Sequence, residues 1–352
     1  MKTNKKDGSN RKNGSNGRFS FLAVAFVAAA FALFSWLLPN PAPTAGDPAA
    51  ADGGAAAENR PENASARAAS HIPGGAGRGL SFATWNMEWF PSGWPEPQEP
   101  AVERRRIADA ARGLRSIGVP DVLFVQEIRD AATCSNFISR LGGNLSLVVC
   151  SDFWMNPTNR SLQQLAVFSR LPCVASGSEP WVASDFVYPP RGFAWAVFDA
   201  GNRRVACFCV HLKSNYVPEG TDRERQEVLN RLKRELAAEQ LVRRMNVIAR
   251  KYASKDGAPP AIVVAGDFNM ALEDERFAGE KTLRTLLKAG LRDAFEGIPE
   301  SQRPTLPANQ WYPAATFDHI LHRGLGEPLA RSVGARIRTS DHCPVFAVFP
   351  AE

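Results

Sequence analysis

The sequence contains no C-x-x-C pair, although it has six cysteines, at positions 134, 150, 173, 207, 209 and 343. The lack of this spacing argues against a structural zinc ion held by cysteines. In an oxidising compartment the cysteines could form disulfides, but six of them allow fifteen pairings and the spacing does not choose among these. A bond between Cys207 and Cys209 is disfavoured, because residues two apart on a strand point to the same face.

Net charge is nearly absent from the part of the chain that can form a core. The whole chain carries a formal +6, yet residues 80–352 have 33 Lys and Arg against 31 Asp and Glu. The basic pI therefore gives no support to nucleic-acid binding. Two basic clusters, Arg104-Arg105-Arg106 and Arg243-Arg244, fall on predicted helices, where a solvated face is the expected explanation.

Charge is missing altogether from Phe19 to Leu38. As a helix, a run of this length spans a hydrocarbon layer of roughly 30 Å. Residues 1–18 before it are rich in Lys and Arg, so the positive-inside rule keeps that tail cytoplasmic and sends the rest across the membrane. We expect residues 19–38 to be a transmembrane anchor and the domain after it to be extracytoplasmic, in the periplasm or at the cell surface. The alternative is a cleaved signal and a secreted protein.

Large apolar residues are scarce from 39 to 79, where Ala, Pro, Gly and small polar residues predominate. Such a segment cannot bury enough apolar surface to offset the entropy of ordering, so it predicts a flexible linker. The globular domain is then expected over residues 80–352.

Short apolar runs within 80–352 predict nine strands, and three longer stretches have helical periodicity. Many strands with few helices favour two packed sheets with helices outside them. The predicted strands are 80–86, 121–126, 145–150, 164–168, 193–198, 204–210, 261–265, 316–321 and 344–349, and the predicted helices are 101–117, 222–252 and 280–289.

Polar residues stand where these strands begin or end, and together they suit the hydrolysis of a phosphodiester. That reaction needs a hard cation, a base that generates hydroxide, and donors to the phosphate oxygens. Asn86, Glu127 and Asp341 offer oxygen ligands for Mg²⁺, with Mn²⁺ or Ca²⁺ as alternatives. His342 suits the base, with Asp318 fixing its tautomer.

Six motifs in this order resemble the endonuclease/exonuclease/phosphatase superfamily, which includes deoxyribonuclease I and the abasic-site endonucleases. The resemblance implies a four-layer α/β/β/α sandwich with the site at one edge. The motifs are W-N-x-E at 85–88, Q-E at 126–127, H-L-K-S at 211–214, G-D-F-N at 266–269, F-D-H-I at 317–320 and S-D-H-x-P-V at 340–345.

The resemblance also implies roles for single residues. Asn86 and Glu127 match the metal-site pair, with Asp341 joining or orienting them. Asp267 and Asn269 match the pair that contacts the scissile phosphate and the attacking water.

The two histidines and two cations complete the resemblance. His211 matches the histidine that binds phosphate or assists the leaving group, and His342 matches the second histidine. Arg191 matches a phosphate-contacting arginine, and Lys213 is a further candidate for substrate binding. Glu88 stands where abasic-site enzymes have Asp, so its role stays open.

A further acidic or tyrosine position of some family members has no evident counterpart near Gln163, Gln164 or Tyr188.

The favoured function is a metal-dependent nuclease that cuts DNA, with RNA also open, and has little sequence preference. One alternative is a phosphatase or phosphodiesterase acting on a lipid or inositol headgroup. Against it, 316–319 reads T-F-D-H where inositol phosphatases read W-C-D-R. A non-catalytic binding module is disfavoured because every expected catalytic position is filled.

Overall fold

The computed structural model describes residues 79–351 except 255–256 and 310–311. The predicted tail 1–18, the predicted membrane segment 19–38 and the linker up to residue 78 lie outside the described residues. Within the described part, none of the helices is both long and apolar enough to cross a membrane.

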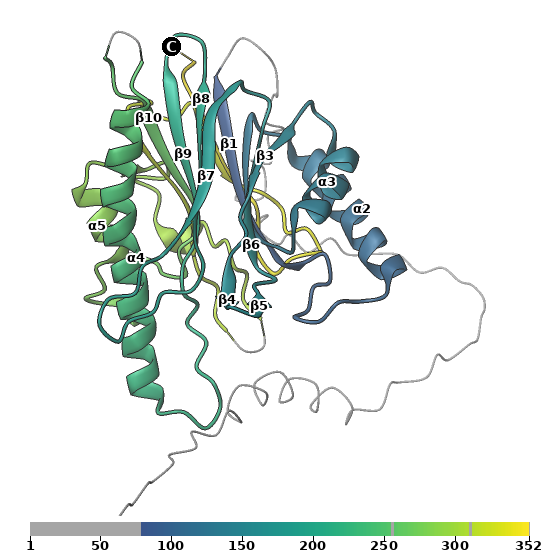
Figure 1. Cartoon of the computed structure of the whole chain (residues 1–352), viewed down its shortest axis with the longest axis vertical. Coiled ribbons are helices and arrows are strands. Elements are labelled where there is room, and N and C mark those ends of the chain that lie inside the picture. Colours follow the sequence, from purple (N-terminus) through teal and green to yellow (C-terminus); the bar gives the residue numbers. More distant parts are fainter. Residues whose placement is uncertain (1–78, 255–256, 310–311, 352) are drawn as a thin grey trace, which may run out of the picture. The chain divides into compact units, whose positions relative to one another are not determined.

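Two six-stranded sheets pack face to face (Figure 1). The first has the order β13-β14-β1-β2-β6-β3 and the second the order β11-β12-β10-β9-β8-β7. Strands of the first sheet are β1 (Leu80–Phe90), β2 (Val122–Ile128), β3 (Ser146–Cys150), β6 (Gln164–Ser169), β13 (Ala330–Val333) and β14 (Val345–Phe349). Those of the second are β7 (Cys173–Pro180), β8 (Gly192–Asp199), β9 (Arg204–His211), β10 (Ala261–Asp267), β11 (Arg292–Asp293) and β12 (Asp318–Arg323). A small hairpin of β4 (Trp154–Asn156) and β5 (Asn159–Arg160) stands apart from both sheets.

Helices cover the outer face of each sheet (Figure 1). Helices α2 (Pro100–Ile117) and α3 (Ala131–Leu141) lie on the first sheet, and α4 (Arg223–Lys251) and α5 (Thr282–Lys288) lie on the second. Two single 3₁₀ turns are present at Glu275–Phe277 and Glu300–Gln302. The α/β/β/α sandwich predicted from the sequence is confirmed.

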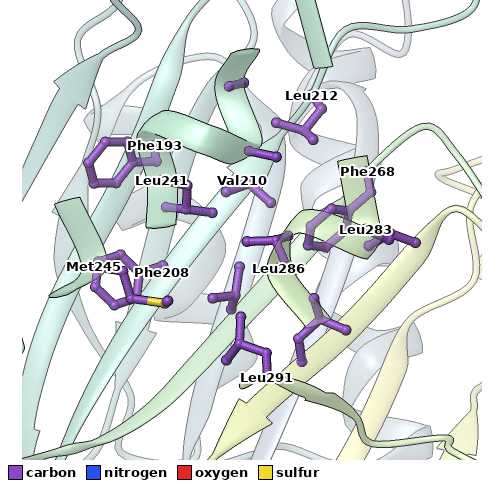
Figure 2. Packing of buried hydrophobic residues seen from close by; sticks show 14 of the residues in the cluster. Phe193, Phe208, Val210, Leu212, Leu241, Met245, Phe268, Leu283, Leu286 and Leu291 are labelled. Atoms are coloured by element: carbon purple, nitrogen blue, oxygen red, sulfur yellow. The ribbon is translucent and has the colours of Figure 1, made fainter. Parts of the chain in front are cut away.

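Successive side chains of a strand point to opposite faces of its sheet, so the buried apolar side chains form three separate layers. On β9, Phe208 and Val210 face α4, whereas Cys207 and Cys209 face the layer between the two sheets. This confirms that the two cysteines share one face. Figure 2 shows the layer under α4 and α5, where Met245 of α4 packs beside Phe208. Each layer excludes water from one face of a sheet, which is the main stabilising contribution to such a sandwich.

All nine predicted strands and all three predicted helices are present, with ends shifted by a few residues. Helix α3 was not predicted. Its N-terminus is capped by Asp130, whose carboxylate accepts a hydrogen bond from Thr133 N at 2.7 Å. The edge strands β7 and β13 were also missed, because both are half-exposed and lack a continuous apolar run.

Strand pairing brings the polar motifs to one edge. Parallel β9 and β10 place His211 opposite Asp267, and antiparallel β12 places Asp318 opposite the same Asp267. In the first sheet, parallel β1 and β2 place Asn86 opposite Gln126, next to Glu127. Residues 40 to 56 positions apart in the chain therefore lie side by side.

Candidate active site

Asp267 lies at the centre of the candidate site and is buried. Its Oδ2 accepts a hydrogen bond from Asn86 Nδ2 at 2.9 Å and lies 3.6 Å from His211 Nε2 and 3.9 Å from His342 Nε2. Burial raises the pKa of Asp267 to about 7, and the negative charge of Asp318 adds to the shift. The carboxyl group is thus poised to exchange a proton near neutral pH.

His342 is paired with Asp318, as the sequence predicted. The distance from His342 Nδ1 to Asp318 Oδ2 is 2.7 Å, and Thr305 donates its hydroxyl to the same oxygen at 2.6 Å. Burial disfavours the imidazolium, but the charge and hydrogen bond of Asp318 outweigh it and raise the pKa of His342 well above its ordinary value. With Nδ1 committed to Asp318, Nε2 is the ring nitrogen that faces Asp267.

His211 is held differently from His342. Burial and the nearby charge of Arg191 lower the pKa of His211 well below its ordinary value, so the ring is neutral. The Arg191 guanidinium also donates to the His211 carbonyl from Nε at 3.3 Å and from Nη2 at 3.2 Å. A neutral histidine and a charged one therefore flank the same Asp267.

Three carboxylates, from Glu88, Glu127 and Asp341, form an acidic cluster beside this centre. Burial raises the pKa of Glu88 to about 7, and the charges of Asp341 and Glu127 add to the effect, although Arg106 opposes it. Nη2 of Arg106 lies 3.4 Å from Glu88 Oε2. Like charges gathered in a half-buried place with hard oxygen donors match what a divalent cation binds.

Asn86 links the acidic cluster to Asp267. Its Nδ2 donates to Glu127 Oε1 at 3.1 Å as well as to Asp267, while its Oδ1 accepts from Glu88 N at 3.0 Å. Trp89 N fixes the other oxygen of Glu127 at 2.9 Å. The Asn86 amide nitrogen therefore orients the carboxylates of Glu127 and Asp267.

Backbone strain is concentrated at the site. Seven non-glycine residues in the described part of the chain have positive φ, and five of them are site residues or their neighbours. A non-glycine residue adopts this conformation only where its surroundings enforce it, which is common in active sites. These five are Glu88 (φ 51°), Trp89 (47°), Glu127 (61°), Arg191 (64°) and Asn269 (54°).

The remaining predicted residues lie around the same centre. Asn269 N donates to Asp267 Oδ1 at 2.8 Å, and the Asn269 carbonyl accepts from Asn215 Nδ2 at 2.8 Å. Lys213 Nζ bonds to Ser214 Oγ at 3.0 Å. Burial and the charge of Arg191 lower the pKa of Lys213 to about 7. The structure therefore brings together all ten predicted site residues.

Sequence reasoning missed three supporting residues. Thr305 holds Asp318, Arg106 contacts Glu88, and Gln163 accepts from Arg191 Nη1 at 3.1 Å. Arg106 was predicted to lie on a solvated face, but it is turned toward Glu88, while Arg104 and Arg105 of the same cluster are exposed. No local sequence pattern marks Thr305 or Gln163, since their partners are distant in the chain.

The endonuclease/exonuclease/phosphatase family model matches residues 83–342. This chain belongs to that family. Its members are hydrolases that act on phosphodiester bonds and depend on a divalent metal, and the matched range contains every residue of the site described above. No curated protein matches the chain.

Solved structures with the same fold are remote in sequence. An endonuclease/exonuclease/phosphatase from Beutenbergia cavernae is 17% identical, with 78% of this chain and 72% of that one covered and a TM-score of 0.53. One from Bacteroides vulgatus is 15% identical, with 78% and 99% covered and a TM-score of 0.53. TDP2 from C. elegans is 18% identical, with 77% and 75% covered and a TM-score of 0.50. At such identities the likeness shows the fold alone.

Proposed function

We propose that this protein is a metal-dependent nuclease that hydrolyses phosphodiester bonds of DNA, and of RNA where it is accessible, with little sequence preference. The observation that carries the proposal is the convergence of an acidic cluster, a charged histidine and a neutral histidine on Asp267 at one sheet edge. Phosphodiester hydrolysis needs three things in one place: a cation site, a proton acceptor, and hydrogen-bond donors to the phosphate oxygens.

The residues proposed to hold the cation are Glu127, Asp341 and Glu88, with Asn86 orienting Glu127. When bound, a divalent cation would neutralise charge that develops on the phosphate. Hard oxygen donors suit Mg²⁺ best, with Mn²⁺ or Ca²⁺ as substitutes. Among the described residues, the group whose ligand atoms lie within 4.8 Å of one another is a different one, Asp267, Asp318 and His342. Because His342 and Asp318 are already hydrogen-bonded to each other, we assign these three to proton transfer and phosphate binding instead.

The chain's own groups divide the acid–base work. Asp267, with its pKa raised to about 7, is the proposed acceptor of the proton of the attacking water, and Asn269 is proposed to orient that water beside it. The sequence suggested His342 as the base. Although burial disfavours the imidazolium, the charge of Asp318 raises the pKa of His342 well above its ordinary value, so we propose instead that the charged ring donates a hydrogen bond to the phosphate from Nε2. Neutral His211 is proposed to bind the phosphate or assist the leaving group.

Two basic residues beside the site, Arg191 and Lys213, suit a polyanionic backbone. Arg191 and Lys213 lie close enough for the charge of Arg191 to lower the pKa of Lys213. Contacts of this kind position a nucleic acid through its phosphates and carry no sequence information. The affinity should accordingly fall as salt rises.

A second candidate function is hydrolysis of a lipid or inositol headgroup. It is favoured by exposed apolar side chains close to the site: Trp154 and Met155 of the β4–β5 hairpin are 53% and 67% exposed. The segment carrying them leads into β6, whose first residue, Gln164, pairs with Ile128 at the end of β2 that bears Glu127. An apolar hairpin there could face a membrane surface.

The decisive experiment compares substrates at equal concentration with Mg²⁺. Duplex DNA, single-stranded DNA, RNA, sphingomyelin and inositol phosphates are each incubated with the protein and with a Glu127→Gln variant. Mg²⁺-dependent cleavage of nucleic acid that is lost in the variant supports the nuclease. Turnover of a lipid or inositol substrate while every nucleic acid stays intact would replace the first proposal with the second.

We also propose that residues 19–38 anchor the chain with the catalytic domain outside the membrane, since the basic tail precedes a single uncharged run. Protease added to intact cells or spheroplasts should then remove the domain. Complete protection of the domain would contradict this topology.

A further inference from the structure

Cys134 and Cys150 bring two thiols together where α3 packs on β3. Cys134 is buried in the first half of α3, and Cys150 is the half-buried last residue of β3, packed against the same apolar cluster that contains Cys134. The two thiols are close enough for each to be the largest influence on the pKa of the other.

The other four cysteines are placed differently. Cys207 and Cys209 are buried side by side on one face of β9, Cys343 is buried next to His342, and Cys173 is exposed on the edge strand β7. Among the cysteines in the described residues, Cys134 and Cys150 are the pair in which each thiol is the largest influence on the pKa of the other; Cys173 affects the pKa of Cys207 less than burial does. Of the cysteine pairs that the sequence left open, the fold therefore favours the one between Cys134 and Cys150.

We propose that Cys134 and Cys150 form an intramolecular disulfide, through exchange with a small-molecule or protein disulfide. In the first step a Cys150 thiolate attacks the external disulfide, forms a mixed disulfide and releases one thiolate. In the second step Cys134 loses its proton, attacks the Cys150 sulfur and expels the second thiolate. The two cysteines are oxidised together by two electrons, and the external disulfide is reduced to two thiols.

The surroundings of the pair support this order of attack. Interaction with the Cys134 thiol and the positive charge of Arg160 lower the pKa of Cys150, although burial opposes them. The same interaction and burial raise the pKa of Cys134. Cys150 is also the more exposed of the two, so it is the thiol that an external disulfide can reach first.

A bond here would tie α3 to β3 and close a loop of about 15 residues, which restricts the unfolded chain. In a domain of this size we expect the melting temperature to rise by roughly 5 °C. The bond would also fix the start of the segment that leads from Cys150 to Gln163, the residue that contacts Arg191.

The test uses the full-length protein after incubation with oxidised glutathione. Free thiols are blocked by alkylation, the protein is digested without reduction, and the peptides are identified by mass spectrometry. We expect a peptide pair linked through Cys134 and Cys150, while Cys207 and Cys209 are recovered unlinked. Alkylation of both Cys134 and Cys150, or a bond between any other pair, would overturn the proposal.

Melting temperatures provide a second readout with matched variants. A dithiol reductant should lower the melting temperature by roughly 5 °C in the wild type and in Cys173→Ala. The variant Cys134→Ala/Cys150→Ala should show no such shift. An equal effect of the reductant on both variants would overturn the assignment. The peptide analysis of the wild type decides the question even if the double variant does not fold.

Discussion

His342 Nδ1 lies 2.7 Å from Oδ2 of Asp318, and both side chains are almost fully buried. Because Thr305 occupies the same carboxylate oxygen from the other side, Asp318 is held by two hydrogen bonds that fix the plane of the imidazole. The ring therefore presents Nε2 toward Asp267 in one orientation. We therefore expect Asp318 to act on the site through His342.

The first prediction is that these two residues act as one unit. Asp318→Asn should lower kcat by roughly 10²- to 10³-fold, the range of a lost electrostatic contribution to the transition state, because the charge that supports the imidazolium is gone. The variant His342→Ala/Asp318→Asn should be little worse than His342→Ala. Steady-state kinetics on the nucleic acid cleaved by the wild type provide the measurement.

A matched control for this cycle is the second buried pair, in which His319 Nδ1 lies 3.1 Å from Asp293 Oδ2. There the other ring nitrogen, Nε2, is 3.3 Å from the Met270 carbonyl, so His319 has no nitrogen facing the site. Asp293→Asn should lower the melting temperature and leave kcat within a few-fold. Additive losses in the His342 and Asp318 cycle would show that Asp318 has a separate task.

The second prediction concerns the cation. Glu127→Gln should reduce kcat by roughly 10²- to 10³-fold, as expected when one electrostatic contribution to the transition state is lost, and should weaken Mg²⁺ binding. The metal-free fold should survive, since the change removes one negative charge from the acidic cluster. Calorimetric titration with Mg²⁺ and the melting temperature of the metal-free protein test the two statements.

The control for this variant is Glu239→Gln on α4, where the carboxylate is 57% exposed and lies 4.0 Å from Arg243. Its activity should be unchanged. Full activity of the wild type in excess chelator would contradict the proposal that the reaction depends on a metal.

The third prediction is a pH dependence of metal binding. The pKa of Glu88 is raised to about 7 in the metal-free protein by burial and by the charge of Asp341, so protons compete with the cation below that pH. Mg²⁺ affinity should rise between about pH 6 and about pH 8 and should be accompanied by proton release. Calorimetry in two buffers of different ionisation enthalpy measures both quantities.

The same shift has a definite sign for stability. A carboxyl group whose pKa is higher in the folded state favours folding at low pH, and its contribution is lost as pH rises through the folded value of about 7. The melting temperature in chelator should therefore fall from about pH 5.5 to about pH 8, and Mg²⁺ should restore it. Glu88→Gln should reduce this dependence, and Asp267, whose pKa burial also raises to about 7, should account for part of what remains. An unchanged slope in that variant would assign the effect to another group.

Much of this arrangement was predictable from the sequence, because most of its strands are short continuous apolar runs bounded by polar residues. The strand ends at His211 and Asp267 could be located, and parallel pairing then brings those ends to one edge. The packing of two sheets with helices outside them could be predicted from the ratio of strands to helices. The position of α3 could not be predicted, because its buried residues are few and its start depends on a single capping carboxylate, Asp130.

The fine structure of the site lay beyond the sequence for a different reason. Thr305 and Asp318 are 13 residues apart and meet only because a loop folds back onto β12. The role of Glu88 likewise depends on Asp341, more than two hundred residues away. Such contacts are set by tertiary packing, and no local pattern encodes them.

The last prediction concerns a buried ion pair behind the site. Arg234 of α4 binds Glu280 with two hydrogen bonds, at 2.8 Å and 2.7 Å, and both side chains are at most 3% exposed. Its remaining donor, Nη1, bonds to the Lys213 carbonyl and to Asn215 Oδ1, each at 2.9 Å. Since Asn215 in turn donates to the Asn269 carbonyl, we expect Arg234 to position the loop that follows β9.

Arg234→Met should destabilise the protein by about 3–5 kcal/mol, because it leaves the Glu280 charge buried without its partner. Arg234→Met/Glu280→Leu should recover much of that stability yet keep a reduced kcat, since the loop still lacks its anchor. Denaturant unfolding and kinetics on the same samples separate these effects.

The exposed pair of Arg223 and Glu227, 3.1 Å apart on the same helix, is the control. Arg223→Met should change the unfolding free energy by less than about 1 kcal/mol. A double variant with restored stability and full activity would show that Arg234 serves the fold and not the site.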